Sequence, residues 1–312
     1  MDFYERLAED INFCEVKEKK NVFNRLSSRY KENLGEGKSS LCNIDEAKVY
    51  ALTRMPATST AISFGLKNLQ NAEIKNILDI GAGSGAGLVG IKNTLHQDVF
   101  VTCLENYTPM VDILKSTAKI LNFKNFNIIN DDMTTANFDA KKYDLVMANY
   151  SLNELHEKKL LQVLNKMYEA TNNYILIIEA GTPRGYEIIM QSKKHLQEMG
   201  MNIVSPCKNA DCPLKNDYCH FLTRLQRPIF DRNIKNGERS YEDEKFSYIL
   251  LSKSAEQDNG LDNIIIRRPE YKKGLVILNC CTKSGEIKTF KISKKQGDFY
   301  KQAKKFNVGD EF

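Results

Sequence analysis

The chain has 312 residues, of which 42% are hydrophobic and 27% charged. This balance is typical of folded proteins and excludes a chain that is disordered throughout. The length predicts one domain of about 150–200 residues with additions, or two domains. No apolar run approaches the roughly 18 residues that a membrane-spanning helix needs, so we expect no membrane partner.

The formal charge of +5 is unevenly distributed along the chain. Residues 267–305 hold twelve Lys or Arg and three Asp or Glu, a net charge of +9, which leaves −4 for the rest. A basic segment attached to a mildly acidic body is typical of proteins that bind phosphate-bearing partners such as nucleic acid. A solvated lysine-rich face is the alternative interpretation.

Residues 1–70 are predicted to form an N-terminal helical cap. Apolar side chains recur there at helical spacing, for example at Val22, Leu26 and Tyr30. The polar stretch Gly35–Ser40 interrupts this pattern. Asn43, with two acidic residues close behind it, is a typical helix start, so the next helix is expected to begin there.

Residues 71–200 alternate short apolar runs with helical stretches, which is typical of a parallel sheet covered on both faces. We expect strands at Asn76–Ile80, Phe100–Glu105, Asn127–Asn130, Leu145–Ala148 and Tyr174–Glu179. Helices are expected near Leu88–Thr94, Pro109–Leu121 and Lys158–Ala170, and from Gly185 to about Met199. Right-handed crossovers between such strands predict a doubly wound α/β sheet.

Residues 201–312 are predicted to form a cysteine loop followed by a basic, β-rich module. The loop, Pro206–Pro228, has little periodicity. Thr282–Gly285 is predicted to be a hairpin turn, and a short helix is expected around Phe299–Phe306. The strands of the module are expected at Phe246–Leu251, Ile264–Ile266, Gly274–Asn279 and Glu286–Ile292.

A glycine loop follows the first predicted strand. The stretch Ile77–Gly85 reads ILDIGAGSG, with glycines at 81, 83 and 85. Glycine lets the backbone turn sharply and approach a ligand closely, and the following helix points its N-terminus at that ligand. Gly81, Gly83 and Ala86 also satisfy the dinucleotide fingerprint G-x-G-x-x-A, so the glycines alone do not distinguish S-adenosylmethionine from NAD.

Three acidic residues favour S-adenosylmethionine. Asp79 can meet the cationic methionyl end of this cofactor, directly or through water, and NAD has no ammonium there. Glu105 is placed to accept both ribose hydroxyls. Asp132 can bond the adenine amino group, and Met133 can pack on the ring. Acids at strand ends are also common helix caps, but three in register predict a class I (Rossmann-like) S-adenosylmethionine-dependent methyltransferase fold.

The segment after the fourth predicted strand carries no familiar catalytic box. Its sequence, ANYSLNE, is neither the Asn-Pro-Pro-Tyr box of amino-group methylation nor the Pro-Cys nucleophile of cytosine-5 methylation. Asn149, Tyr150, Asn153 and Glu154 can line a pocket, with Asn149 in the cofactor site, whereas Asn153 and Glu154 can equally cap the next helix. Whether the protein is an active methyltransferase therefore stays open.

Three cysteines lie within thirteen residues, namely Cys207, Cys212 and Cys219. Three soft ligands on a loop indicate zinc or an iron–sulfur cluster, since disulfides are disfavoured in reducing compartments. The fourth ligand is either His220 or a distant cysteine. Cys280 and Cys281 are adjacent on a later predicted strand, where pleating turns only one of them inward. Three unligated buried thiols are the alternative.

Several segments together resemble one family, the methyltransferase-like assembly proteins of the mitochondrial and bacterial small ribosomal subunit, which includes human methyltransferase-like protein 17 and the related yeast protein. The resemblance covers nearly the whole chain from about residue 22. Besides the cysteine loop, it rests on LSSRY at Leu26–Tyr30, RMPAT at Arg54–Thr58, LDIGAGSG at Leu78–Gly85, YSLNEL at Tyr150–Leu155, EAGTPRG at Glu179–Gly185, LQRP at Leu225–Pro228 and YEDEKFSY at Tyr241–Tyr248.

The resemblance implies a protein that binds the immature small ribosomal subunit and its rRNA as a monomer. It implies that S-adenosylmethionine binding is kept, with an assembly role in place of methyl transfer. An active rRNA methyltransferase is the alternative. It further implies a 4Fe–4S cluster on Cys207, Cys212, Cys219 and Cys281, with zinc as the alternative. Cys281 is preferred to Cys280 because the family's Cys-Thr dipeptide before the hairpin turn matches Cys281-Thr282.

The N-terminal sequence bears on the compartment. The first twenty residues carry six acids and four bases, which fits neither a signal peptide nor a mitochondrial presequence. We expect the bacterial cytoplasm, with the mitochondrial matrix as the alternative.

Overall fold

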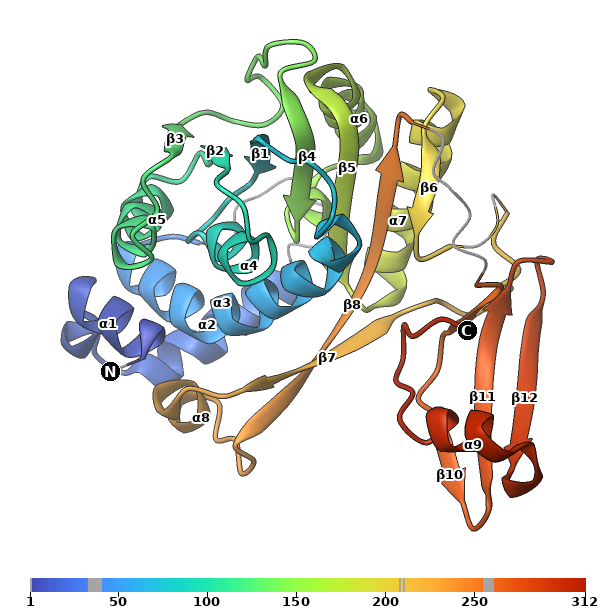
Figure 1. The fold of residues 1–312 in the computed structure, drawn as a ribbon. Helices are drawn as coiled ribbons and strands as arrows, with labels where there is room; N and C mark the ends of the chain where they lie inside the picture. Colours follow the sequence, from blue (N-terminus) through green and yellow to red (C-terminus); the bar gives the residue numbers. More distant parts are fainter. Residues whose placement is uncertain (1, 33–40, 208, 210, 255–260) are drawn as a thin grey trace.

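The computed structural model describes residues 2–32, 41–207, 209, 211–254 and 261–312. The predicted polar break at Gly35–Ser40 lies outside these residues. The main sheet has the strand order β3-β2-β1-β4-β5-β8-β6, and β7 pairs with the remaining part of β8 (Figure 1). Its strands are β1 (Asn76–Ile80), β2 (Phe100–Leu104), β3 (Phe126–Ile129), β4 (Tyr143–Asn149), β5 (Thr171–Ala180), β6 (Asn202–Ser205), β7 (Phe221–Gln226) and β8 (Tyr241–Ser252).

The five strands expected within residues 71–200, β1 to β5, are present and pair with one another in parallel, as predicted. β8 runs antiparallel to β5, β6 and β7. Side chains alternate between the two faces of the sheet, as at Ile77 and Leu78 of β1, which belong to two separate buried clusters. The sheet is therefore buried on both sides, which explains why its central strands are almost wholly apolar.

Helices cover both faces of this sheet (Figure 1). Ile77 lies in the cluster that contains side chains of α3, α4 and α5, and Leu78 lies in the cluster of α6 and α7. The helices expected along the Rossmann-like part are confirmed with shifts of a residue or two. They are α4 (Ala86–Thr94), α5 (Thr108–Ile120), α6 (Glu157–Ala170) and α7 (Pro183–Glu198), and the 3-10 turn η3 (Leu152–Glu154) precedes α6.

The predicted N-terminal helical cap packs on the same side as α4 and α5. It comprises α1 (Phe3–Asp10), η1 (Phe13–Glu15), α2 (Lys19–Glu32), α3 (Ile44–Leu66) and η2 (Lys67–Leu69). Asn43 caps α3 as predicted, because its side chain accepts a hydrogen bond from the Glu46 backbone N–H at 2.9 Å. None of the described helices combines the length and apolarity needed to cross a bilayer.

The C-terminal part requires two corrections. The strand predicted at Phe246–Leu251 is not part of the basic module: it belongs to the C-terminal half of β8, between β5 and β6 of the main sheet. The expected boundary at residue 200 therefore does not separate two sheets. The loop Pro206–Pro228 is also shorter than predicted, since Phe221–Gln226 forms β7, which is followed by α8 (Ile229–Ile234).

A second, small sheet forms the basic module. Its order is β10-β11-β12, with β9 paired to β11. The turn predicted at Thr282–Gly285 joins β11 to β12. It is closed by a hydrogen bond from Thr282 N–H to the Glu286 carbonyl at 2.9 Å. The module has its own buried cluster, which includes Cys280 and Phe306. Its elements are β9 (Asn263–Ile265), β10 (Glu270–Lys272), β11 (Leu275–Thr282), β12 (Ile287–Ser293), η4 (Lys294–Gln296) and α9 (Gly297–Ala303).

Candidate functional site

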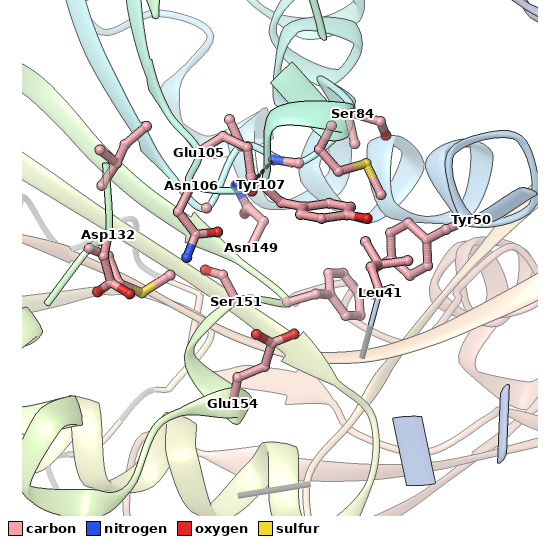
Figure 2. A pocket seen from close by; sticks show the side chains of 18 of the residues that line it. Leu41, Tyr50, Ser84, Glu105, Asn106, Tyr107, Asp132, Asn149, Ser151 and Glu154 are labelled. Atoms are coloured by element: carbon pink, nitrogen blue, oxygen red, sulfur yellow. Dashed lines mark hydrogen bonds between the residues drawn. The ribbon is translucent and has the colours of Figure 1, made fainter. Parts of the chain in front are cut away.

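A cavity of about 200 Å³ lies where β1, β2 and β4 reach their carboxyl ends. Ligands of open α/β sheets bind at this edge, where the strand order reverses between β1 and β4. Six of the eight predicted cofactor-site residues line the cavity: Gly81, Gly83, Glu105, Asp132, Met133 and Asn149. Asp79 and Gly85 do not line it. Figure 2 shows Glu105, Asp132 and Asn149 around the cavity.

The three glycines of the loop have positive φ values, of 71°, 54° and 95° at Gly81, Gly83 and Gly85. A Cβ added to Gly83 meets nothing closer than the Gly81 carbonyl oxygen at 4.0 Å. A Cβ added to Gly85 instead lies 2.9 Å from side-chain atoms of Leu114 and Thr117. Gly83 therefore borders open space on the cavity side, whereas Gly85 packs against α5.

Glu105, directly after β2, holds the glycine loop in place. Its Oε2 accepts a hydrogen bond from Gly83 N–H at 2.8 Å, and its Oε1 accepts from Tyr107 N–H at 2.8 Å. Burial raises the pKa of this carboxyl group, while the backbone hydrogen bonds from Tyr107 and Gly83 act in the opposite direction. Each carboxylate oxygen keeps a second lone pair, so Glu105 can still accept a hydrogen bond from a ligand.

Asp132 and Met133 line the other end of the cavity. Asp132 Oδ1 accepts hydrogen bonds from the Thr134 N–H at 2.7 Å and from its hydroxyl at 2.6 Å. Burial opposes ionisation of Asp132, but these bonds outweigh it, so the pKa is lowered from its ordinary value. Asp132 is thus charged at neutral pH and close to Asn106, which also lines the cavity.

Asp79 is separated from the cavity by Asn149. Asp79 is 2% exposed, and its Oδ2 lies so close to Gly87 of α4 that a Cβ there would be 2.0 Å away. Its Oδ1 accepts from Asn149 Nδ2 at 3.3 Å. Burial raises the pKa of Asp79 to about 7, the hydrogen bond from Asn149 lowers it, and Glu105 raises it slightly. Asn149 Oδ1 is buried and, among the described residues, has no hydrogen-bond partner.

The residues after β4 form one wall of the cavity. Tyr150, in a left-handed conformation with φ 57°, donates its hydroxyl to Glu244 Oε1 at 2.9 Å. Arg54 Nη2 donates to the same oxygen at 2.9 Å. Ser151 donates to the Ile80 carbonyl at 3.0 Å. The hydroxyls of Tyr150 and Ser151 therefore both donate to groups of the protein itself. Arg54, Tyr150 and Glu244, which these hydrogen bonds join, belong to three of the motifs that carry the family resemblance.

Glu154, at the end of η3, faces the cavity (Figure 2). Burial raises the pKa of its carboxyl group to about 7, and the charge of Glu105 adds to this. Asn153, by contrast, turns away to donate to Glu179 Oε2 at 2.8 Å. The sequence predicted either a helix cap or a pocket residue at both positions. In the structure Glu154 lines the cavity, whereas Asn153 is bound to Glu179 of β5.

The helical cap supplies a wall that sequence analysis missed. Leu41 and the aromatic residues Tyr30 and Tyr50 line the cavity from α2, α3 and the segment between them. The two tyrosine rings are stacked, with centroids 5.3 Å apart. The helical spacing of Tyr30 predicted only an apolar face of the cap, and no local signal in the sequence indicates that either tyrosine lines a cavity.

A second cavity is lined by the four cysteines that were predicted to be metal ligands. Cys207, Cys212, Cys219 and Cys281 all line it, and Cys280 lies on the opposite side of β11, fully buried in the core of the basic module. The prediction that pleating separates the two adjacent cysteines is confirmed. Apolar side chains complete the lining, among them Leu214, Phe221, Ile264 and Ile266.

Two polar groups contact the cysteine loop from α7. Tyr186 Oη and Cys212 Sγ are 3.1 Å apart. Lys193, only 1% exposed, donates to the Asn209 carbonyl at 2.9 Å. Burial raises the pKa of the Cys207 thiol, and the positive charge of Lys193 acts in the opposite direction. Among the described residues, no three His, Cys, Asp or Glu side chains stand in positions that would hold a single metal ion.

His220, the predicted alternative ligand, does not line the cysteine cavity. Its ring centroid lies 5.3 Å from that of Tyr218. Burial, followed by the charges of Lys245 and Arg267, lowers the pKa of His220 to about 4. The imidazole is therefore neutral at physiological pH.

The lysines of the basic module are exposed. Lys288, Lys291, Lys294, Lys295 and Lys305 all face solvent. Arg267 instead pairs with Asp217 of the cysteine loop, and Asn209 Nδ2 donates to the Thr282 carbonyl at 2.6 Å. These two contacts attach the loop to the module.

The fold and the cavity define a class of protein. A sheet of order β3-β2-β1-β4-β5-β8-β6 with antiparallel β8, and a glycine loop after β1, is the class I S-adenosylmethionine-dependent methyltransferase fold, as predicted. The chain belongs to the family described as "Mitochondrial small ribosomal subunit Rsm22", whose pattern it matches over residues 44–312. The predicted family resemblance is therefore confirmed.

Two curated relatives carry related names. "Ribosome assembly protein RSM22, mitochondrial" of Saccharomyces cerevisiae is 22% identical over 55% of this chain and 44% of that protein. "Ribosome assembly protein METTL17, mitochondrial" of Homo sapiens is 24% identical over 54% of this chain and 39% of that protein. The matches thus cover less than half of the length of these relatives. Both are named as mitochondrial, so they give no support to the bacterial cytoplasm.

One solved structure that aligns with this chain is bacterial. It is a SAM-dependent methyltransferase from Aquifex aeolicus, which aligns with a TM-score of 0.44 and 14% identity and covers 69% of this chain and 100% of that one.

Proposed function

We propose that this protein is an assembly factor of the small ribosomal subunit that holds S-adenosylmethionine in the β1–β4 cavity and contacts rRNA through its basic module. The observation that carries the assembly role is the family match over residues 44–312. Because both curated relatives are named as mitochondrial, the matrix is the better-supported compartment.

The charges of the cavity support S-adenosylmethionine over NAD. In this proposal Glu105 accepts the ribose hydroxyls, and Asp132 and Met133 hold the adenine. The orphaned Asn149 Oδ1 accepts a hydrogen bond from the methionyl ammonium. Asp79 acts from behind Asn149, through the hydrogen bond that fixes the amide. A buried hydrogen-bond acceptor without a partner, such as Asn149 Oδ1, destabilises the free protein. A ligand group that donates to it therefore stabilises the complex.

Calorimetry on the purified protein tests this assignment. S-Adenosylmethionine is expected to bind and NAD is not, since NAD offers no ammonium to Asn149. Asn149→Leu removes the acceptor at nearly constant volume and is expected to weaken S-adenosylmethionine binding by about tenfold or more, the effect of one buried hydrogen bond to a charged group. Equal affinity of the wild type for the two cofactors contradicts the proposal.

We further propose that Cys207, Cys212, Cys219 and Cys281 hold an iron–sulfur cluster of the 4Fe–4S type. Four thiols that share one largely apolar cavity fit the donor set of such a cluster. When bound, the cluster would supply a covalent tie between the cysteine loop and the basic module, in addition to the Arg267–Asp217 and Asn209–Thr282 contacts. Anaerobically purified protein is then expected to contain about four irons per chain and to absorb near about 400 nm. One stoichiometric zinc in a colourless protein contradicts this.

The rRNA contact rests on the exposed lysines of the basic module. Lysines that meet phosphates release counterions, so binding is expected to weaken steeply with salt. Methyl transfer is the competing function. The hydroxyls that follow β4 are committed to Glu244 and Ile80, which favours an assembly role. Mass spectrometry of small-subunit rRNA with and without the gene tests this, and a methylated nucleotide that depends on the gene would establish an active enzyme.

A further inference from the structure

One wall of the β1–β4 cavity carries a carboxylate without a counter-ion. Glu154 points into the cavity from the side opposite Glu105 and Tyr107 (Figure 2). Among the described residues, its carboxylate has no hydrogen-bond donor and no ion-pair partner. The nearby backbone is held independently, because Glu179 accepts from Leu152 N–H at 2.9 Å and from Asn153 at 2.8 Å. The position of Glu154 therefore does not depend on any bond of its own side chain.

Two aromatic residues of the helical cap share the cavity with Glu154. Tyr30 of α2 and Tyr50 of α3 line the same cavity, and their rings are nearly parallel, at 21°. Burial raises the pKa of both phenols. The negative charge of Glu154 raises both further, after the effect of Tyr50 on Tyr30 and against the charge of Arg54 on Tyr50. A carboxylate beside aromatic faces is the arrangement with which proteins bind onium cations.

The charges around Glu154 also favour a cation. Four acids line the cavity, Glu105, Asp131, Asp132 and Glu154, against one base, Lys159, among the described lining residues. Lys159 is solvent-exposed and interacts with Asp132. Arg54, the other nearby cation, is paired with Glu244. Glu179, behind the wall, adds a further acid. A half-buried carboxylate that has no counter-ion in the protein is stabilised strongly when a bound ligand supplies a positive charge.

We infer that Glu154, with Tyr30 and Tyr50, is a subsite for the sulfonium of S-adenosylmethionine, and that it makes the protein select this ligand over S-adenosylhomocysteine. The inference rests on the proposed cofactor assignment. The two ligands share adenine, ribose, ammonium and carboxylate, and they differ in one methyl group and one positive charge at sulfur. A neutral thioether can contact the rings but has no charge to pair with a carboxylate or with the ring quadrupoles, whereas a sulfonium gains electrostatically from both. Occupancy then reports the charged methyl donor and not its demethylated product.

Calorimetry on the 312-residue chain tests the inference with three ligands. They are S-adenosylmethionine, S-adenosylhomocysteine, and sinefungin, which carries a protonated amine near the sulfonium position. The wild type is expected to bind the two cationic ligands at least about tenfold more tightly than S-adenosylhomocysteine. Glu154→Gln is nearly isosteric and is expected to lower this ratio severalfold, leaving the preference that the two rings supply, while changing the affinity for S-adenosylhomocysteine by less than about twofold. Glu157→Gln, which removes an exposed acid at the start of α6, is the matched control and is expected to keep the wild-type ratio.

The outcomes separate the two proposals. If the wild type binds none of the three ligands, the cofactor assignment itself is wrong. If it binds S-adenosylmethionine and S-adenosylhomocysteine equally, the cofactor assignment stands and the sulfonium subsite is wrong. If Glu154→Gln weakens all three ligands equally, the carboxylate contacts a group that they share, which also overturns the inference. Tyr50→Leu provides a second variant, and a reduced preference with unchanged S-adenosylhomocysteine binding supports the aromatic contribution.

Discussion

Replacing Gly83 by alanine is expected to weaken ligand binding strongly while lowering the stability of the fold only slightly. The added Cβ meets no protein atom within 4.0 Å except the Gly81 carbonyl oxygen at that distance, so it projects into open space on the cavity side. The left-handed φ of 54° costs about 1–2 kcal/mol for any residue with a Cβ. At roughly 2–4 °C per kcal/mol for a protein of this size class, the melting temperature is expected to fall by a few degrees. The Gly83 N–H to Glu105 hydrogen bond survives the change.

Binding is expected to respond far more strongly than stability. A methyl group in the space through which the cofactor contacts the loop forces it outward, so the affinity for S-adenosylmethionine should drop by about tenfold or more, or about 1.4 kcal/mol. Gly85→Ala is the matched control. Its Cβ overlaps Leu114 and Thr117 at 2.9 Å, away from the cavity lining.

Gly85→Ala should therefore lose about 2–5 kcal/mol of stability, the sum of backbone strain and overpacking, yet keep its affinity below its melting temperature. Calorimetric titration and thermal unfolding monitored by circular dichroism give both quantities. The reasoning is refuted if Gly83→Ala binds as the wild type does while Gly85→Ala loses binding.

Three further predictions concern the other parts of the molecule. Replacing Lys291 and Lys294 by glutamine should flatten the slope of log K against log salt for rRNA binding by up to about 1.8, and an unchanged slope returns these residues to a solvated face. Cys219→Ser should lose the iron and the absorption near about 400 nm, whereas Cys280→Ala should keep both, and equal loss in the two variants contradicts the ligand assignment. Because burial raises the pKa of Glu154 to about 7, the preference for S-adenosylmethionine over S-adenosylhomocysteine should rise from about pH 6 to about pH 8 as this carboxyl ionises, and a flat ratio at constant ionic strength argues against it.

Local patterns in the sequence predicted much of the main domain. β1 begins and ends at the predicted residues, and Asn43 caps α3 as expected. Both depend on neighbours within a few positions: an apolar run that meets glycines, and a side chain that reaches the N–H three residues on. The same locality placed Glu105, Asp132 and Asn149 at strand ends, which a parallel sheet necessarily gathers at one edge.

The sequence alone determined that this chain forms a doubly wound sheet with a glycine loop and that it carries a cysteine-rich loop. Only the tertiary structure decided that Phe246–Leu251 completes the main sheet, because an apolar strand looks the same whichever partner it pairs with. It also decided that Asp79 lies behind Asn149, and that Tyr30 and Tyr50 line one cavity with Glu154, which is more than a hundred residues further along the chain. Such contacts arise when separate helices and strands pack together, and periodicity within one element shows which face is buried but not what covers it.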